Sequence, residues 1–397
     1  MHKLLVATVL LMGCAGPQQA EPIESSAVVS STMSTSTSTS TALSSPPSSS
    51  SPGTSAPMGF DSEWFDWVVV ADTVGRGAID VQAAVVRNGL VVHQLQFSGS
   101  PSPAPVSVTS RFRVASISKV LTAMTVMRLV EDGVIGLDDR PLAEVAGRLG
   151  ITLGDPRLAD VTVLQLLSHT SGLASGSDLY FDSPELDADG ALGAALIQSL
   201  TSDPGTQFTY SNTNYVILGR LVGWRTGTSW DDAARDVVLE PLGLDGWRVG
   251  RTTSDEEGDA HYAVETGRNY MEVLEAAGAW TAPATEVALL VDALGRGELF
   301  RSPATSRMML QPSSAGPPDE DWTYGLGVRI FAGGLWGHSG TLENTHDMVV
   351  WLPDGTVVSV LVNGTEPSDS DRLIDTIRRS VSPDGDVSLA SATTTVG

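Results

Sequence analysis

A serine and a lysine three residues apart, Ser116 and Lys119, are the residues of this sequence best suited to nucleophilic catalysis. Apolar residues around them recur at intervals of three and four, which predicts the buried face of a helix that Gly133 can end. These apolar residues are Ile117, Val120, Leu121, Met124 and Met127. Positions i and i+3 of a helix are neighbours, so the hydroxyl and the amine can approach hydrogen-bonding distance.

This spacing suits one kind of chemistry. A serine hydroxyl becomes a good nucleophile when a neighbouring base takes its proton. A lysine amine can be that base when burial or nearby positive charge lowers its pKa. The pair therefore predicts a covalent acyl-enzyme on Ser116 that Lys119 activates.

The lysine content strengthens this interpretation over a chance spacing. Lysine occurs only at Lys3 and Lys119, and the other 21 of the 23 basic residues are arginine. Lys3 is expected to leave with a signal peptide. Because arginine cannot lose its proton at accessible pH, a site that needs a titratable amine would have to keep a lysine.

Two further polar segments could complete a site. Tyr210-Ser211-Asn212 follows a Pro-Gly turn and precedes a helical run, which predicts a loop position for Tyr210 and Asn212. Alone, it is equally typical of a tyrosine beside a helix cap. His338-Ser339-Gly340-Thr341 precedes a predicted hairpin and is, alone, equally typical of a bulged strand.

Together the segments resemble the penicillin-recognising serine hydrolases, which comprise serine β-lactamases, DD-peptidases and related esterases. The marks of that family are Ser-x-x-Lys, then Ser- or Tyr-x-Asn, then Lys- or His-[Ser/Thr]-Gly. Residues 161–173 and 276–280 add further matches, so the resemblance covers roughly residues 60 to 380. It implies a β-lactamase/transpeptidase-like fold and no cofactor.

The resemblance implies a role for each matched residue. Ser116 would be the nucleophile and Lys119 its proton acceptor. Tyr210 would carry a proton to the leaving group and activate the deacylating water, and whether Lys119 or Tyr210 is the main base stays open. Asn212 would hold Lys119 and a substrate amide oxygen. The backbone N–H groups of Ser116 and Thr341 would form the oxyanion hole.

His338 stands where β-lactamases commonly have lysine. It implies a weaker, pH-dependent positive charge near a substrate carboxylate, with Ser339 and Gly340 beside it in the substrate-binding strand. This departure favours DD-peptidase-like and esterase-like members over an efficient β-lactamase. Glu343-Asn344, where relatives often have small residues, leaves the preference for anionic substrates open.

Other histidine chemistry is less well supported. His169 invites a Ser-His-Asp interpretation, but its segment is typical of a structural helix end. His261, His338 and His346 show neither His-Glu-x-x-His nor short paired spacings, so no metal site is predicted.

The elements that must position these residues follow from periodicity and turns. A helix is predicted near residues 63–70, then a hairpin of strands 81–86 and 90–94 around Asn88-Gly89. The middle of the chain, 117–292, has mainly helical patterns. Strands 325–331, 347–352 and 357–362 and a helix over 372–380 follow. We expect a mixed α+β fold of the α/β type, with an antiparallel sheet built from both termini, flanked by helices and interrupted by a mainly helical region.

Composition bounds the function classes. With a formal charge of −24, the chain would repel nucleic acid and anionic lipid headgroups. Its single cysteine, Cys14, lies outside the predicted core, which leaves no disulfide, thiolate metal site or cysteine nucleophile there.

The N-terminus is typical of an exported lipoprotein. Lys3 precedes the apolar run 4–12, which is too short to span a bilayer, and Leu11-Met12-Gly13-Cys14 resembles a lipobox, in which the cysteine is acylated. An ordinary signal peptide is the alternative. The predicted location is the outer side of a bacterial cell membrane, or a periplasmic or outer-membrane lipoprotein.

Four segments are expected along the chain: a lipoprotein signal peptide over 1–14, a Ser/Thr/Pro-rich linker over 15–57, a hydrolase domain over 58–380 and a flexible tail over 381–397.

The sequence therefore predicts a serine hydrolase whose partner is a small acyl substrate: a peptidoglycan stem peptide, a β-lactam or an ester. The preferred activity is that of a D-alanyl-D-alanine carboxypeptidase-like peptidase or a small-ester hydrolase. A serine β-lactamase, or a non-catalytic cell-envelope binding lipoprotein, is the alternative.

Overall fold

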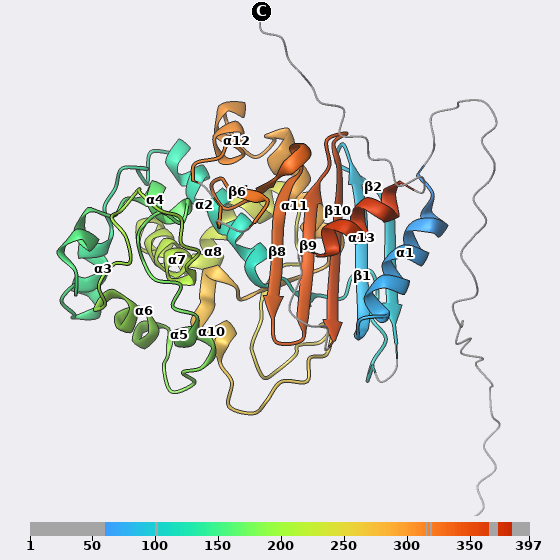
Figure 1. Ribbon diagram of the computed structural model, residues 1–397, viewed down its shortest axis with the longest axis horizontal. Coiled ribbons are helices and arrows are strands. Elements are labelled where there is room, and N and C mark those ends of the chain that lie inside the picture. The colour runs from blue at the N-terminus through green and yellow to red at the C-terminus, as the bar shows by residue number, and fades with distance from the viewer. Residues whose placement is uncertain (1–59, 100–101, 315, 318–319, 365–371, 383–397) are drawn as a thin grey trace, which may run out of the picture. The chain divides into compact units, whose positions relative to one another are not determined.

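Strands from both ends of the chain share one antiparallel sheet in the computed structural model, which describes residues 60–99, 102–314, 316–317, 320–364 and 372–382 (Figure 1). The seven strands lie in the order β2-β1-β10-β9-β8-β7-β6. Their bounds are β1 Ala78–Arg87, β2 Leu90–Ser98, β6 Trp322–Tyr324, β7 Arg329–Phe331, β8 Trp336–Leu342, β9 Thr345–Trp351 and β10 Thr356–Gly364. A small sheet, β3-β5-β4, has β3 Phe112–Arg113, β4 Arg248–Val249 and β5 Trp280–Ala282.

The predicted fold class is confirmed. The first long strand, β1, pairs with the last, β10, with Val81 opposite Val362. The hairpin of β1 and β2 turns at Asn88 and Gly89, whose φ angles are 52° and 75°. Both angles are positive, as the tightest hairpin turns require.

One predicted strand is wrong. Residues 325–331 do not form a continuous strand, because a turn after β6 occupies residues 325–328 and only Arg329–Phe331 are extended as β7. Gly327 has φ 81°, and a Cβ on it would lie 2.3 Å from the Ala123 Cβ in α2 (Ser118–Glu131). The glycine therefore forms a turn that packs tightly on α2.

Helices cover both faces of the sheet (Figure 1). On one face, α1 (Ser62–Val74) and α13 (Leu373–Val381) share an apolar cluster with the strands. On the other face, α11 (Ala284–Arg296) and α2 belong to a larger cluster that continues into the helical region.

The predicted helical region lies at one end of the sheet, to the left in Figure 1. Its helices are α3 Leu142–Leu149, α4 Val163–Leu167, α5 Ser177–Phe181, α6 Ala188–Leu196, α7 Asn212–Thr226, α8 Trp230–Ala234, α9 Glu240–Leu242 and α10 Tyr270–Leu274, and α12 Pro303–Met309 follows α11. Within the described ranges, no helix has the length and apolarity needed to cross a membrane.

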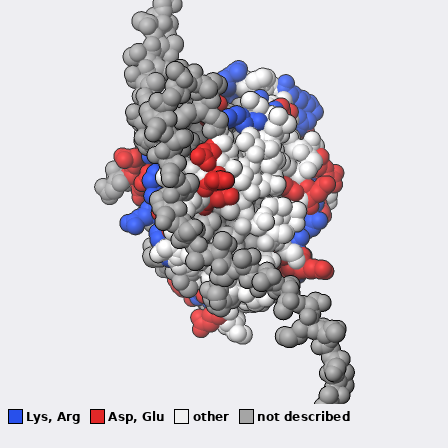
Figure 2. Space-filling model, turned by 90° about the vertical axis from the view of Figure 1, so that its right-hand side faces the viewer, with Lys and Arg blue, Asp and Glu red and all other residues white. Residues whose placement is uncertain are grey.

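The edge strand β2 carries exposed apolar side chains near its start. Leu90, Val91 and Val92 are exposed there. Figure 2 shows this side, where uncharged residues occupy much of the visible face between acidic and basic side chains. The predicted signal peptide (1–14), the linker (15–57) and most of the tail (381–397) lie outside the described residues.

Candidate active site

Ser116 and Lys119 are in contact. Ser116 lies in a single 3₁₀ turn, Ala115–Ile117, that leads into α2, and Lys119 is in the first turn of that helix. The Lys119 Nζ lies 3.0 Å from the Ser116 Oγ. The predicted proximity is confirmed, although Ser116 precedes the α-helix instead of opening it. Ala115 has φ 46°, and such strained backbone is concentrated at functional sites.

Lys119 is fully buried and has two carbonyl neighbours besides Ser116. Its Nζ donates to the Asn212 Oδ1 over 2.9 Å and to the Ala277 backbone oxygen over 2.7 Å. Burial, followed by the positive charge of Arg329, lowers the pKa of Lys119 well below its ordinary value.

These contacts set the direction of the amine in its neutral form. A neutral amine has two N–H donors and one lone pair. If the carbonyls of Asn212 and Ala277 accept the two donors, the lone pair faces the Ser116 hydroxyl. The arrangement therefore suits Lys119 to take the proton of Ser116.

Tyr210 and Asn212 join this pair from a second segment. Asn212 is the first residue of α7, and Tyr210 lies two residues before it. The Lys119 Nζ is 5.0 Å from the centroid of the Tyr210 ring. The sequence-predicted residues Ser116, Lys119, Tyr210 and Asn212 thus lie together.

Strand β8 brings the third motif to the nucleophile. A Cβ on Gly340 would lie 2.6 Å from the Val114 backbone oxygen and 3.2 Å from the Ala115 Cβ. Only a glycine lets β8 lie this close to the segment before Ser116. Thr341 follows directly, and the oxyanion role of its N–H and that of Ser116 stays a prediction.

His338 lies in an environment that disfavours the charge that the sequence suggested. It is fully buried; its Nδ1–H donates to the Ser339 oxygen over 2.6 Å, and its Nε2 accepts from the Tyr324 hydroxyl over 3.1 Å. Burial, followed by the charges of Arg329 and Lys119, lowers the pKa of His338 well below its ordinary value. This environment disfavours a positive charge on His338, and its role at a substrate carboxylate stays a prediction.

His169 packs against Tyr210 and accepts hydrogen bonds from residues at the start of α7. It is fully buried, and its ring centroid is 4.4 Å from that of Tyr210. Its Nδ1 accepts from the Asn214 side-chain amide over 2.9 Å and from the Ser211 N–H over 3.2 Å. These partners are amides and not a carboxylate, so His169 does not form a Ser-His-Asp relay.

Three residues of the site had not been singled out from sequence. The Ala277 carbonyl belongs to the backbone, which has no residue signature, and only the Ala276–Trp280 match marked its segment. Tyr324 contacts His338 from β6. Arg329, on β7 opposite Gly337, is the nearby fixed cation, and its guanidinium lies 4.4 Å from the centroid of the Trp322 ring.

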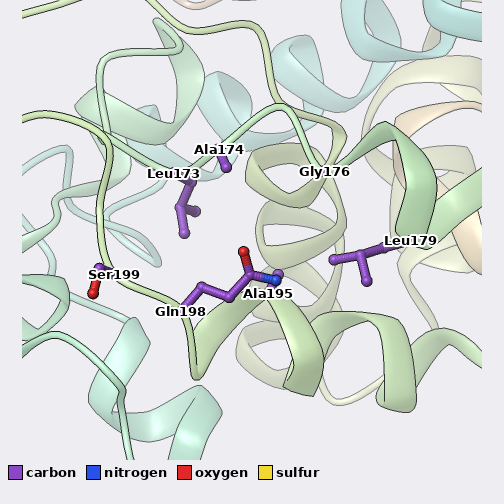
Figure 3. Close-up of a pocket in the computed structure, with 7 residues that line it drawn as sticks. All are labelled: Leu173, Ala174, Gly176, Leu179, Ala195, Gln198 and Ser199. Atoms are coloured by element: carbon purple, nitrogen blue, oxygen red, sulfur yellow. The ribbon is translucent and has the colours of Figure 1, made fainter.

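No metal cluster accompanies these residues. Across the described ranges, no three His, Cys, Asp or Glu side chains gather as metal ligands. Figure 3 shows a small pocket elsewhere, in the helical region, that contains none of the residues above; it is lined by Leu173, Ala174, Gly176, Leu179, Ala195, Gln198 and Ser199.

Comparison with known proteins agrees with the geometry. Penicillin-binding protein 4 of Amycolatopsis lactamdurans is 42% identical over 142 residues, which cover 35% of this chain and 36% of that protein. Esterase EstB of Burkholderia gladioli is 29% identical over 192 residues, which cover 43% of this chain and 46% of the esterase. The chain therefore aligns with less than half the length of each of these two relatives.

A solved structure shares the fold. A D-stereospecific amidohydrolase from Streptomyces sp. superposes with a TM-score of 0.67 at 21% identity, over 81% of this chain and 98% of the amidohydrolase. The Beta-lactamase family matches residues 68–382, which include every residue of the site described above. With its Ser116–Lys119 pair in place, this chain belongs to the Beta-lactamase family of serine hydrolases.

Proposed function

We propose that this serine hydrolase cleaves D-alanyl-D-alanine-like peptides or small esters through an acyl-enzyme on Ser116. The observation that carries the proposal is the setting of Lys119, which is buried, has a lowered pKa and lies within hydrogen-bonding distance of Ser116, Asn212 and Ala277. A structural lysine would be paired with a carboxylate, whereas this one faces a hydroxyl and two carbonyls.

In the proposed first step, the Lys119 lone pair takes the Ser116 proton while the Ser116 Oγ bonds to the substrate carbonyl carbon. The oxyanion receives hydrogen bonds from the Ser116 and Thr341 N–H groups. The leaving group takes a proton from Lys119 or through Tyr210 as its bond to carbon breaks. Water then attacks the acyl-enzyme, releases the acid and returns the proton to Ser116.

The charge around the site supports a substrate with a carboxylate. The pKa of His338 is lowered, and Arg329 is a permanently charged group whose field reaches Lys119, His169 and His338. A guanidinium stays charged at every accessible pH and matches a carboxylate in geometry. This supports a peptide that ends in a free carboxylate. The relatives named as a penicillin-binding protein and an esterase support the same range of acyl substrates.

The test compares the wild type with Ser116→Ala. Purified protein is incubated with a fluorescent penicillin, a p-nitrophenyl ester and a D-alanyl-D-alanine tripeptide. We expect slow penicillin labelling and turnover of the ester or peptide, all abolished by Ser116→Ala. Fast release of hydrolysed penicillin would favour a β-lactamase instead. Absence of any Ser116-dependent labelling or turnover would leave a binding protein.

We also propose that the enzyme is exported and tethered by lipid at Cys14, on the outer side of a bacterial membrane. Lys3, the apolar run 4–12 and the lipobox-like sequence before Cys14 support this proposal. Wild type should fractionate with membranes and incorporate labelled palmitate, and Cys14→Ser should do neither. Membrane association that persists in Cys14→Ser would reject the lipid tether.

A further inference from the structure

The turn at residues 274–278 presents two successive backbone carbonyls to α2. The Ala277 oxygen accepts from the Lys119 Nζ over 2.7 Å, and the Ala276 oxygen accepts from the Thr122 Oγ1 over 2.7 Å. The turn begins at Glu275, which has φ 43° although it is not a glycine. Such a conformation persists only where its surroundings hold it.

The side chain of Glu275 forms an ion pair that joins the turn to α7. Its Oε2 lies 2.8 Å from the Nε of Arg220, and the Nη2 of Arg220 lies 2.8 Å from the Asp189 Oδ1 in α6. The side chains of Glu275 and Arg220 are 16% and 26% exposed, so solvent screens the pair only in part. Helix α7 also begins with Asn212, and it therefore carries both another partner of Lys119 and the anchor of this turn.

Packing between Gly219 and Ala276 also joins the turn to α7. A Cβ on Gly219 would lie 2.5 Å from the Ala276 Cβ, so α7 and the turn touch there. Beside this contact, however, Ala276 borders a small cavity lined by Thr122, Thr125, Gly219, Val222, Trp230 and Ala234. The Glu275–Arg220 pair is therefore a polar contact between the turn and α7, in addition to the packing at Gly219.

We propose that Glu275 is a positioning residue: its ion pair with Arg220 fixes the turn that directs the Ala277 carbonyl at Lys119, and so directs the Lys119 lone pair at Ser116. Ala277 and Asn212 each accept one N–H of the neutral amine, and loss of either acceptor frees the amine to rotate. The catalytic consequence rests on the proposed function, whereas the effect on Lys119 itself does not.

The Glu275–Arg220 ion pair should respond to pH near neutrality. Burial raises the pKa of Glu275 to about 7, although Arg220 lowers it and Asp189 and Asp231 raise it further. As the pH falls through this value, a proton neutralises the Glu275 carboxylate and weakens its attraction to Arg220. We therefore expect acylation to slow as the pH falls from 8 to 6, and Glu275→Gln to remove the part of this dependence that Glu275 causes.

The lysine content offers a direct readout. Lys3→Arg in the full chain leaves Lys119 as the only lysine, so ¹³C-labelled lysine gives a single side-chain signal whose pH titration reports the pKa of Lys119. The titration is compared in Glu275→Gln, Glu275→Asp and Arg220→Gln. The shorter aspartate keeps the negative charge but withdraws it from Arg220. Asp189→Asn is the matched control, because it removes a charge of the same cluster and leaves the Glu275–Arg220 pair.

We expect the first three variants to lower the pKa of Lys119 by about one, because the ammonium loses an acceptor, and to slow acylation about tenfold. Asp189→Asn should change neither. An unchanged Lys119 titration in folded Glu275→Gln and Arg220→Gln would overturn the proposal. So would a wild-type titration in Glu275→Asp, because charge alone would then explain the effect. Since the titration needs no substrate, it decides the role of Glu275 even if no Ser116-dependent turnover is found.

Discussion

At the scale of single residues, the neutral form of Lys119 determines what the site can do. Its two N–H groups are accepted by carbonyls, and only the lone pair is left for Ser116. Lys119→Arg would fill the same volume with a cation that cannot take a proton. We expect acylation to slow by about 10³-fold, within the range found for loss of a general base. Stopped-flow measurement of the acyl-enzyme checks this, with exposed Arg140→Lys as the control.

Stability at acid pH should depend on buried His169. Burial, followed by the charge of Lys119, lowers its pKa well below the ordinary value of 6.5. Below pH 6.5 His169 then binds a proton in the unfolded chain but not in the folded chain. The fold therefore loses stability as the pH falls. The loss amounts to as much as about 1.4 kcal/mol per pH unit until the folded-state pKa is reached.

The variant His169→Asn tests this effect, because asparagine tolerates the positive φ of position 169. At pH 7.5 we expect it to be less stable than the wild type. Urea unfolding at pH 7.5, 6.0 and 5.0 should show the difference between the two proteins shrinking with acid. A constant difference would contradict a lowered pKa of His169.

The sequence predicted the residues of the site better than their environments. The spacing of Ser116 and Lys119 on a helix implied their contact directly. The environment of His338 could not be predicted, because it depends on burial and on a contact with Tyr324 of another strand, β6. The Ala277 carbonyl could not be predicted either, since its direction is set by a turn and not by its own side chain.

At the scale of elements, the close contact of β8 with the segment before Ser116 should be sensitive to a single methyl group. Gly340→Ala would place a Cβ 2.6 Å from the Val114 oxygen and displace the strand. A shift of about 1 Å can cost 10²-fold in rate, and we expect a loss of about this size in acylation. Stability should fall by about 1–3 kcal/mol.

The control for this prediction lies in α6. A Cβ on Gly193 meets nothing within 4 Å, so Gly193→Ala should leave activity unchanged and stabilise the helix by up to about 1 kcal/mol. Equal activity in Gly340→Ala and the wild type would show that β8 does not need the glycine.

Elements were predictable where local rules decide them. Asn88-Gly89 marked the first hairpin because both residues accept positive φ. The strand expected over 325–331 was wrong because Gly327 is needed for close packing on α2, which is far away in sequence. Local alternation of residue types contains no information about that contact.

At the scale of the whole molecule, the central sheet separates two apolar clusters but belongs to both. Adjacent residues of β10 divide between them: Val357 and Leu361 face the cluster of α2 and α11, and Val358 and Val360 face that of α1 and α13. Damage on one face should therefore destabilise the site on the other.

Ile377→Ala in α13 tests this coupling. Ile377 is fully buried, and its truncation should cost about 2–5 kcal/mol. The urea midpoints of tryptophan fluorescence and of ester hydrolysis should fall together. The neighbouring Arg378 is partly exposed, so Arg378→Ala should shift both urea midpoints only slightly. Loss of fluorescence well before loss of activity would show that the two faces unfold separately.

The pairing of β1 with β10 also has a consequence for synthesis. On the ribosome, β1 emerges about 280 residues before β10, its second neighbour in the sheet after β2, since Val81 pairs with Val362. Ser116 and Lys119 are translated well before β8 and β9, the strands that complete the site. Contacts of such long sequence separation form late and slowly. A nascent chain therefore acquires its catalytic centre only after β8 and β9 have been synthesised.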